Sequence, residues 1–348
     1  MIGGEKVGSI RILARHFSTV KKTKLGWRKV AVDIPETFDV VKLFKKNNYF
    51  GALVDVKNPR FLKGGMNPKG KSYGARVNVL PSKRVLDKAY SLFAKGLVIH
   101  DELSNSHWDV IFMNPSGKYS YLYDVEKKAK NKRKKFSAAA DFDNRLGLIN
   151  RSVNRRIIGG DIMALAMRTL LDTKMRVGSE VYYKVDKHKG LTTLKRGDVK
   201  ILGNRVTFSY ISKDGVPRTI VNVFSDEYIN NLKKVLRKLK KKDFIFTDGS
   251  KRPLKDLDFM KAFKEYCGEE FYPHIVRSHY ATKEAEKFLN NHKKATKEEI
   301  DKLFMSIAEK LGHKRYSKIG RRWETDYGAT IHYYIKPKFV DKILKLVK

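Results

Sequence analysis

Five polar residues in the C-terminal two-thirds of the chain could together bind a phosphodiester and attack it. They are Arg176, Lys213, Arg277, His313 and Tyr334. Guanidinium, ammonium and imidazole groups can hold a phosphate and stabilise the charge that develops when it is displaced. A tyrosine phenol can replace water as the nucleophile, which leaves the cut end covalently attached to the protein. These residue types therefore point to phosphoryl transfer.

The charge of the chain indicates what carries the phosphodiester. The 348 residues contain 75 Lys and Arg against 37 Asp and Glu, a formal net charge of +38. Such an excess favours a polyanionic partner, most commonly nucleic acid. Hydrophobic residues make up 41% and aromatic residues 11%, so the chain is no disordered basic tail. Its length suggests about two domains with real cores.

Several classes of protein are disfavoured. The single cysteine, Cys267, excludes an internal disulfide and a cysteine-rich zinc site. The sequence contains no run of 18 apolar residues, so it predicts no membrane span. Asp141 and Asp143 could suggest a metal nuclease, but no third carboxylate has a matching spacing. Residues 1–28 carry one acid and seven bases, which is compatible with an organelle-targeting segment, although we favour a basic arm facing nucleic acid.

The first 124 residues favour a mixed, strand-rich domain. Glycine and proline mark loops between the β-like segments, and an apolar stripe at helical spacing over 82–95 predicts one helix. The expected strands lie at 29–33, 51–56, 75–80 and 108–113.

A strongly basic run follows this domain. Residues 127–135 carry seven positive charges in nine positions and no acid. Such a run repels itself when free and becomes ordered on a phosphate backbone. We therefore expect residues 125–136 to form a hinge between the domains that lies along the nucleic acid.

Residues 137–348 favour a mainly helical domain with one small sheet. Asp161 is placed as an N-cap, Thr296 and Glu299 as a capping box, and Pro337 as a first-turn proline. Residues 206–211 and 216–223 predict a hairpin, with Pro217 on an edge strand. The expected fold class is thus α+β.

The segments around the five residues are similar to those of a known family. Arg176-Val-Gly-Ser-Glu180, followed by Gly190-Leu-Thr-Thr-Leu194, resembles the Arg-x-Gly-Asn-Glu and Gly-Leu-Thr-Thr-Leu pattern of type IB DNA topoisomerases, particularly the compact poxvirus and bacterial type. Ser179 stands where the family usually has asparagine. The likeness covers residues 115–348 and implies the catalytic fold shared by these enzymes and the tyrosine recombinases.

The next three segments carry the resemblance further. Lys213 lies in Ser-Lys-Asp-Gly, like the catalytic lysine of the family's Gly-Lys-Asp turn. Arg277 lies in His274-Ile-Val-Arg-Ser-His-Tyr-Ala-Thr282, which fits both the topoisomerase and the recombinase pattern. His313 follows Leu-Gly, as in poxvirus topoisomerases and recombinases. The resemblance implies that Arg176, Arg277 and His313 bind the phosphate, while Lys213 protonates the leaving oxygen.

The nucleophile has three candidates. Tyr334-Ile-Lys-Pro337 looks like the family's Tyr-[Ile/Leu]-x-Pro segment, and we favour Tyr334. Tyr327-Gly-Ala-Thr also matches a poxvirus pattern, and Tyr333 is adjacent. Tyr334 lies 21 positions after His313, a longer gap than in compact relatives. The extra stretch, 314–327, is basic, so we expect it to contact DNA.

The remaining candidates are DNA contacts. The segment from Gly117 to Tyr123 resembles the poxvirus segment whose tyrosines touch DNA, although alternating tyrosines can equally be half-buried residues of a sheet. The expected DNA-binding residues are Lys118, Tyr121, Tyr123, Lys127, Lys128, Lys130, Lys132, Arg133, Lys134, Lys135, Arg321 and Arg322.

The resemblance implies a type IB DNA topoisomerase that relaxes supercoiled double-stranded DNA through a 3′-phosphotyrosyl intermediate. The bond energy stays in the phosphotyrosine, so we expect no need for ATP, a metal or another cofactor, and the chain has no Walker A sequence. We expect a monomer that works with DNA inside the cell. The alternative is a tyrosine recombinase or integrase, and a basic binding protein without catalysis would explain the charge alone.

Overall fold

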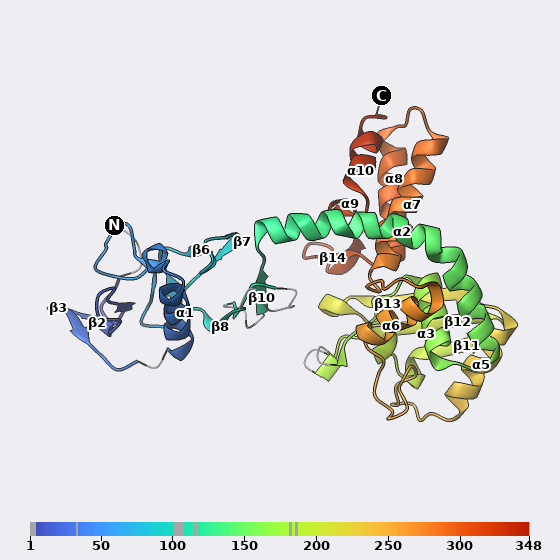
Figure 1. Cartoon of the computed structure of the whole chain (residues 1–348), viewed down its shortest axis with the longest axis horizontal. Helices are drawn as coiled ribbons and strands as arrows, with labels where there is room; N and C mark the ends of the chain where they lie inside the picture. The colour runs from blue at the N-terminus through green and yellow to red at the C-terminus, as the bar shows by residue number, and fades with distance from the viewer. Residues whose placement is uncertain are drawn as a thin grey trace. The chain divides into compact units, whose positions relative to one another are not determined.

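The computed structural model describes residues 5–32, 34–100, 108–114, 117, 119–180, 183–184 and 187–347, without the side chains of 35 and 131–133. The chain divides into two compact units, residues 1–133 and residues 134–348. Helix α2 (Val125–Ile158) begins in the first unit and continues through the second (Figure 1). The α+β class expected from the sequence is confirmed.

The first unit is built from short antiparallel strands and one long helix, α1 (Pro35–Lys46). A five-stranded sheet has the order β3-β2-β1-β4-β5, a three-stranded sheet the order β10-β9-β8, and β6 pairs with β7. Their core includes Ile12, Phe44, Val77 and Tyr90. The strands are β1 (Ile10–Ile12), β2 (Thr19–Thr23), β3 (Gly26–Lys29), β4 (Gly65–Met66), β5 (Ser72–Tyr73), β6 (Val77–Val79), β7 (Val85–Tyr90), β8 (Lys95–Ile99), β9 (Val110–Met113) and β10 (Tyr119–Leu122).

The prediction of a helix over residues 82–95 was wrong. Residues Val85–Tyr90 form β7 and pair with β6, and β8 begins at Lys95. Leu86 and Tyr90 are buried while Val85 is exposed, which is the side-chain alternation of a strand. The pairing with β6 overrode a helical spacing that was compatible with either structure. The strand expected at 51–56 overlaps a short 3-10 helix at Phe50–Leu53, and near the strand expected at 29–33 the structure has β3, which ends at Lys29.

The basic run is helical. Residues 125–136 form the first turns of α2, and the boundary between the two units falls inside that helix. The Asp124 carboxylate accepts from the backbone N–H of Lys127 at 2.7 Å, which caps the first turn. Lys127 and Lys128 pair with Asp109 and Asp87, so part of the repulsion expected within the run is neutralised by acids of the first unit.

The second unit contains two hydrophobic cores. The larger one joins α2, α3 (Ile162–Thr173), α5 (Asp226–Arg237) and α6 (Asp256–Cys267) to a three-stranded antiparallel sheet in the order β11-β12-β13. The strands are β11 (Val199–Leu202), β12 (Arg205–Ile211) and β13 (Pro217–Val223). The expected hairpin is confirmed, and Pro217 begins the edge strand, where its missing N–H costs no ladder bond.

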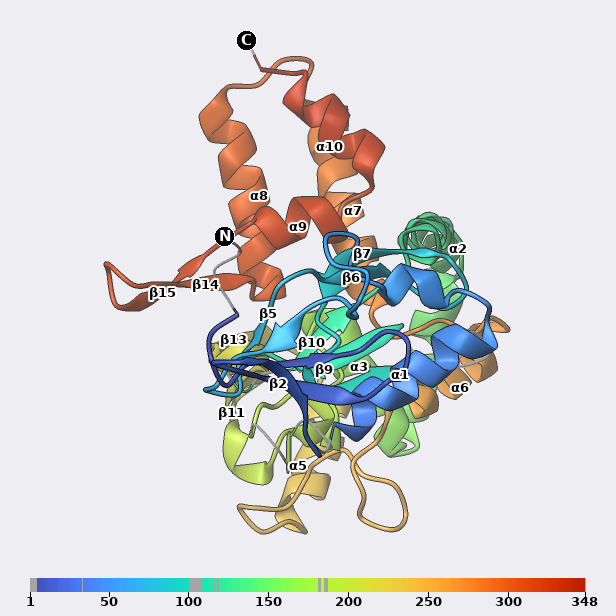
Figure 2. The same cartoon turned by 90° about the vertical axis from the view of Figure 1, so that its left-hand side faces the viewer.

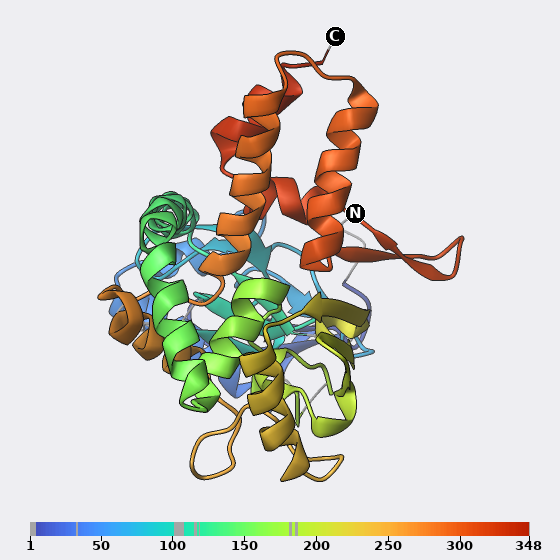
Figure 3. The same cartoon turned by 90° about the vertical axis from the view of Figure 1, so that its right-hand side faces the viewer.

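The smaller core lies within a group of four helices, which stands apart from the sheet in Figures 1 and 3. They are α7 (Ile275–Asn291), α8 (Lys297–Leu311), α9 (Gly328–Tyr333) and α10 (Pro337–Leu344). The Thr296–Glu299 capping box opens α8, and Pro337 occupies the first turn of α10, as expected. A two-stranded ribbon, β14 (Lys314–Ser317) and β15 (Arg322–Thr325), connects α8 to α9.

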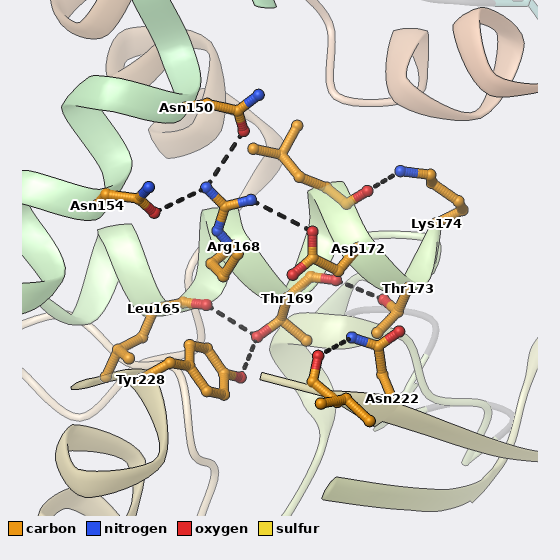
Figure 4. Close-up of polar contacts among 12 residues, drawn as sticks. Asn150, Asn154, Leu165, Arg168, Thr169, Asp172, Thr173, Lys174, Asn222 and Tyr228 are labelled. Atoms are coloured by element: carbon orange, nitrogen blue, oxygen red, sulfur yellow. Dashed lines mark hydrogen bonds and ion pairs between the residues drawn. The ribbon is translucent and has the colours of Figure 1, made fainter. Parts of the chain in front are cut away.

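Helix α3 is fixed to both of its neighbours by polar contacts (Figure 4). Asp161 caps its N-terminus, as expected. The Arg168 guanidinium donates to Asn150 Oδ1 at 3.2 Å and to Asn154 Oδ1 at 3.0 Å, which ties α3 to α2. The hydroxyls of Thr169 and Tyr228 lie 2.5 Å apart, which ties α3 to α5. The chain beyond the C-terminus of α3 is therefore held firmly.

We predict that Arg168→Met destabilises the protein by about 2 kcal/mol, because hydrogen bonds to a charged group are lost while the aliphatic packing is retained. Arg155→Met, at an exposed position of α2, is the matched control. Urea unfolding monitored by circular dichroism measures both. Equal stability of the two variants would show that the Arg168 contacts do not hold α3.

Candidate active site

Tyr334 lies at the C-terminal end of α9 with its side chain turned inward. It is only 5% exposed. Its hydroxyl is 3.1 Å from His274 Nε2. Its ring centroid lies 4.6 Å from that of His313, and Arg277 Cζ lies 5.2 Å from the ring centroid. The phenol is thus surrounded by cationic and imidazole groups.

Arg277 lies in the first turns of α7 and is fully buried. Its guanidinium donates to the carbonyls of Lys174 and Leu311, and to His313 Nε2 at 3.2 Å. Its Nε–H has no hydrogen-bond partner among the described residues. Burial lowers the pKa of Arg277 to about 10, so the group stays charged at neutral pH. A buried cation with an unused donor is suited to an anion.

His313 follows the left-handed cap of α8. Gly312 has φ 70°, which favours glycine, and a Cβ there would lie 2.2 Å from the Arg218 guanidinium and displace it. Since arginine can only donate, Nε2 of His313 accepts from Arg277 and Nδ1 carries the proton towards Thr330 Oγ1, 2.7 Å away. Burial, followed by the charges of Arg277 and Arg176, lowers the pKa of His313 to about 3.

Arg176 lies beyond α3 in extended chain. Helix α3 ends at Thr173, and Lys174 turns the backbone into the left-handed region before Arg176. Gly178 and Gly190 pack backbone to backbone, because a Cβ on Gly190 would lie 2.6 Å from Gly178 Cα. The Arg176 carbonyl accepts from the backbone N–H of Leu191 at 2.8 Å. The two glycine-containing segments thereby fix the position of Arg176.

His274 joins Arg176 to Tyr334, and it was absent from the sequence-derived set of site residues. Arg176 Nη1 and the Tyr334 hydroxyl each lie 3.1 Å from His274 Nε2. Burial, followed by the charges of Arg277 and Arg176, lowers the pKa of His274 well below its usual range. The sequence did contain a signal that could have identified His274 as a site residue. It lies three residues before Arg277, which places both side chains on one side of the first turn of α7.

Lys213 reaches the same region from the sheet. It occupies a short 3-10 turn (Lys213–Gly215) between β12 and β13 and is exposed. A cavity of about 330 Å³ is lined by Arg176, Lys213 and His313. Arg218, from β13, also lines it and donates to the carbonyls of Leu311 and Lys310 at 2.9 and 3.0 Å. The described residues include no carboxylate partner in an ion pair with Arg176, Arg218 or Arg277.

The other two candidate nucleophiles lie in different surroundings. The Tyr327 hydroxyl donates to Asp301 at 2.8 Å, and its ring packs on Phe304. Tyr333 is 55% exposed. Its carbonyl accepts from Lys135 Nζ, which also lies 4.9 Å from the Tyr334 ring centroid. Of the three, Tyr334 is the one among the arginines and histidines.

The expected DNA contacts lie in several environments. Lys127, Lys128 and Lys135 contact protein groups, whereas Lys130 and Lys134 are exposed. Tyr121 and Tyr123 are half-buried, and Arg321 and Arg322 lie on the β14–β15 ribbon. Lys118 lies outside the described residues, as do the side chains of Lys132 and Arg133.

The described residues hold no group of three or more His, Cys, Asp or Glu side chains suited to a metal ion. Asp143, considered for a nuclease, pairs instead with His279 at 2.7 Å and Lys283 at 2.8 Å. Within the same part of the chain, no helix is both long and apolar enough to span a bilayer.

Comparison with known proteins shows which family the sequence matches. The family described as "Eukaryotic DNA topoisomerase I, catalytic core" matches residues 124–324, more than half of the chain. The DNA topoisomerase 1B of Acanthamoeba polyphaga mimivirus is 25% identical over 228 residues, which cover 60% of this chain and 68% of that protein. Two solved structures of the XerH site-specific recombinase bound to difH substrates are 15% and 16% identical, each with a TM-score of 0.37. They match 57% and 58% of this chain, and the chain spans about half of theirs, 50% and 52%.

We predict that His313 makes stability depend on pH. Its folded pKa is depressed, so the unfolded state binds more protons between about pH 6.5 and 3, and stability falls as pH falls through that window. One such proton corresponds to about 1.4 kcal/mol per pH unit. In urea unfolding between pH 6 and 4, His313→Asn should therefore have a shallower slope than the parent.

His332→Asn, at an exposed position two residues before Tyr334, is the control for replacing a histidine by asparagine, and its slope should equal that of the parent. Identical slopes for the parent and His313→Asn would mean that the imidazole can be protonated in place.

Proposed function

We propose, since this chain belongs to the DNA topoisomerase I family of isomerases that act on DNA, that it relaxes supercoiled DNA by transient cleavage of one strand. The family match covers the segment that carries Arg176, Lys213, Arg277 and His313, and the proposed nucleophile, Tyr334, follows it as the C-cap of α9. All five proposed catalytic residues come from one chain, and we propose that a monomer suffices.

The observation that carries the proposal is the buried cation beside the phenol. Arg277 is fully buried, has no carboxylate partner among the described residues, and its Nε–H has no hydrogen-bond partner there, while its Cζ lies 5.2 Å from the Tyr334 ring centroid. Desolvating a cation without a counter-ion costs several kcal/mol, roughly, and an anion at the site offsets that cost. A backbone phosphate supplies the charge, and its nonbridging oxygens match the fork of a guanidinium.

In the proposed cleavage step, Tyr334 attacks the phosphorus of one backbone phosphate. A bond forms between its phenolic oxygen and phosphorus, and the bond from phosphorus to the 5′-oxygen breaks. Arg176 and Arg277 stabilise the charge on the nonbridging oxygens. When Arg176 turns to the phosphate, His274 Nε2 is released to accept the phenolic proton, since both groups lie 3.1 Å from it.

Lys213 is the proposed acid for the leaving group. It gives a proton to the 5′-oxygen, which departs as a hydroxyl while the 3′ end stays on the tyrosine. His313 orients Arg277 through its Nε2 and is in turn held by Thr330. After the free strand has rotated, the 5′-hydroxyl attacks the phosphotyrosine and the steps reverse. The number of phosphoester bonds is conserved, so the cycle consumes no ATP.

The proposed DNA-binding surface includes the exposed Lys130 and Lys134 of α2, together with Lys132 and Arg133 from the same run. Lys127, Lys128 and Lys135 belong to it if phosphate replaces their present protein contacts. Tyr121, Tyr123 and Lys118 of the first unit, and Arg321 and Arg322 of the β14–β15 ribbon, complete the set. Contacts of this kind release counterions, which makes binding depend strongly on salt.

We predict that the purified chain relaxes both negatively and positively supercoiled plasmid with EDTA present and ATP absent, because rotation about the uncut strand is driven by the torsional energy of the DNA. Agarose gels of the topoisomers measure the outcome. Activity that requires a divalent metal, or that yields only linear DNA, would identify a nuclease. Recombinant junctions between defined sites as the main product would identify a recombinase.

We predict that Tyr334→Phe binds duplex DNA with unchanged affinity but forms no covalent adduct, because the ring still packs and only the nucleophilic oxygen is lost. Denaturing gels of a labelled duplex measure the adduct. Tyr327→Phe should still form it, since that hydroxyl is engaged with Asp301. Peptide mapping of the parent adduct provides an independent check, and an adduct on Tyr327 or Tyr333 would contradict the assignment of the nucleophile.

A further inference from the structure

The β14–β15 ribbon begins beside the end of α8, and its tip projects away from the second unit, as Figures 2 and 3 show. Its strands pair from Lys314↔Thr325 to Ser317↔Arg322, and residues 318–321 form the tip. It is inserted between two proposed catalytic residues, His313 and Tyr334.

The root of the ribbon is part of the candidate active site. Lys314, Arg315 and Asp326 line the same cavity as Arg176 and His313. The backbone N–H of Asp326 donates to the carbonyl of His313 at 3.0 Å, which closes the ribbon directly onto that residue. The root of the ribbon is therefore anchored at the cavity. Four strand residues at about 3.3 Å each place the tip roughly 13 Å from His313.

The surface of the ribbon is cationic. Residues 314–325 carry five bases and one acid. Arg322 pairs with Glu324 at 3.1 Å and Arg315 with Asp326 at 3.5 Å. No ion pair is found for Lys314, Lys318 or Arg321 within the described part of the chain. This charge fits a polyanion at the cavity mouth.

The tip has a defined backbone conformation, and it carries an apolar side chain. Arg321 adopts φ 48°, a left-handed conformation unusual for a residue with a Cβ, and the backbone N–H of Gly320 donates to Ser317 Oγ at 3.1 Å. Behind the tip, the rings of Tyr316 and Trp323 pack edge to face with centroids 5.4 Å apart. This arrangement leaves Ile319 99% exposed.

One exposed isoleucine is unremarkable by itself. Its meaning comes from its place at the tip of a basic, two-stranded ribbon rooted at a proposed phosphate site. The major groove of B-DNA is about 12 Å wide and admits a two-stranded ribbon without deformation, whereas the minor groove is only about 6 Å wide and would have to open. In the major groove, the apolar group available to an aliphatic side chain is the 5-methyl group of thymine.

We propose that the β14–β15 ribbon enters the major groove of duplex DNA and that Ile319 contacts a thymine methyl group there. The inference rests on the proposed function for its location, because the scissile phosphate is taken to lie at the cavity. At 3.4 Å per base pair, a tip roughly 13 Å away reaches about four base pairs from the cut. The ribbon then gives this chain a preference for thymine at one or two positions on that side.

Uracil interference tests the proposal. Duplexes carrying random dU in place of dT, which lack only the methyl group, are bound to the protein; bound and free fractions are separated and the dU positions are mapped. For the parent we expect dU to be depleted about 3- to 10-fold from the bound fraction at one or two adjacent positions, the effect of no longer burying one methyl group. Ile319→Ser should abolish the depletion, and Ile319→Leu should retain it.

Leu202→Ser is the matched control. Leu202 is 84% exposed at the end of β11, outside the ribbon, and its replacement should leave the interference pattern of the parent unchanged. Uniform dU tolerance in the parent, or an unchanged depletion in Ile319→Ser, would overturn the proposal.

The readout is binding, so it is independent of cleavage. If no duplex yields an adduct but dU is still depleted, the proposed catalysis fails and the ribbon contact stands. If adducts form but dU is tolerated everywhere, the ribbon contact is contradicted and the proposed catalysis stands. Where adducts form, their position on the DNA gives the distance from the depleted thymines, and a separation far from about four base pairs would contradict the major-groove placement.

Discussion

The candidate active site depends on one buried guanidinium. Arg277 is fully buried, and its donors bind the carbonyls of Lys174 and Leu311 and the imidazole of His313. These groups come from the end of α3, the end of α8 and the residue that follows it. Helix C-termini present unpaired carbonyls, so a cation bonded to two of them satisfies acceptors that would otherwise be buried unpaired. The same interaction brings the segments with Arg176, His313 and Tyr334 to one place.

The excess of positive charge around this cluster explains its other properties. Burial lowers the pKa of both His274 and His313, and the charges of Arg277 and Arg176 lower both further, with Arg218 adding to the effect at His313. Neutral imidazoles are compatible with so many cations because they add no further charge. They also accept hydrogen bonds from the arginines, which orients the guanidinium groups before an anion is present.

The second unit combines a packed frame, which holds the candidate active site, with segments that project from it. The site is built at the ends of packed helices and at close glycine contacts, where Gly178, Gly190 and Gly312 leave no room for a side chain. The Lys213 turn and the β14–β15 ribbon extend from this frame, with exposed cations at their tips. We infer that the frame sets the geometry of the chemistry and that the projecting segments adapt to the DNA.

The sequence by itself determined the features that depend on neighbouring residues. The Asp161 cap, the Thr296–Glu299 box, the hairpin around Lys213 and the α+β class all follow from local hydrogen bonding and side-chain periodicity. Only the tertiary structure decided the rest. Residues 85–90 became a strand through pairing with β6, acids of the first unit help to stabilise a helix in the basic run, and His274 gained its place by lying between Arg176 and Tyr334. The physical reason is that these outcomes depend on contacts between separate segments of the chain, which the local pattern of each segment does not encode.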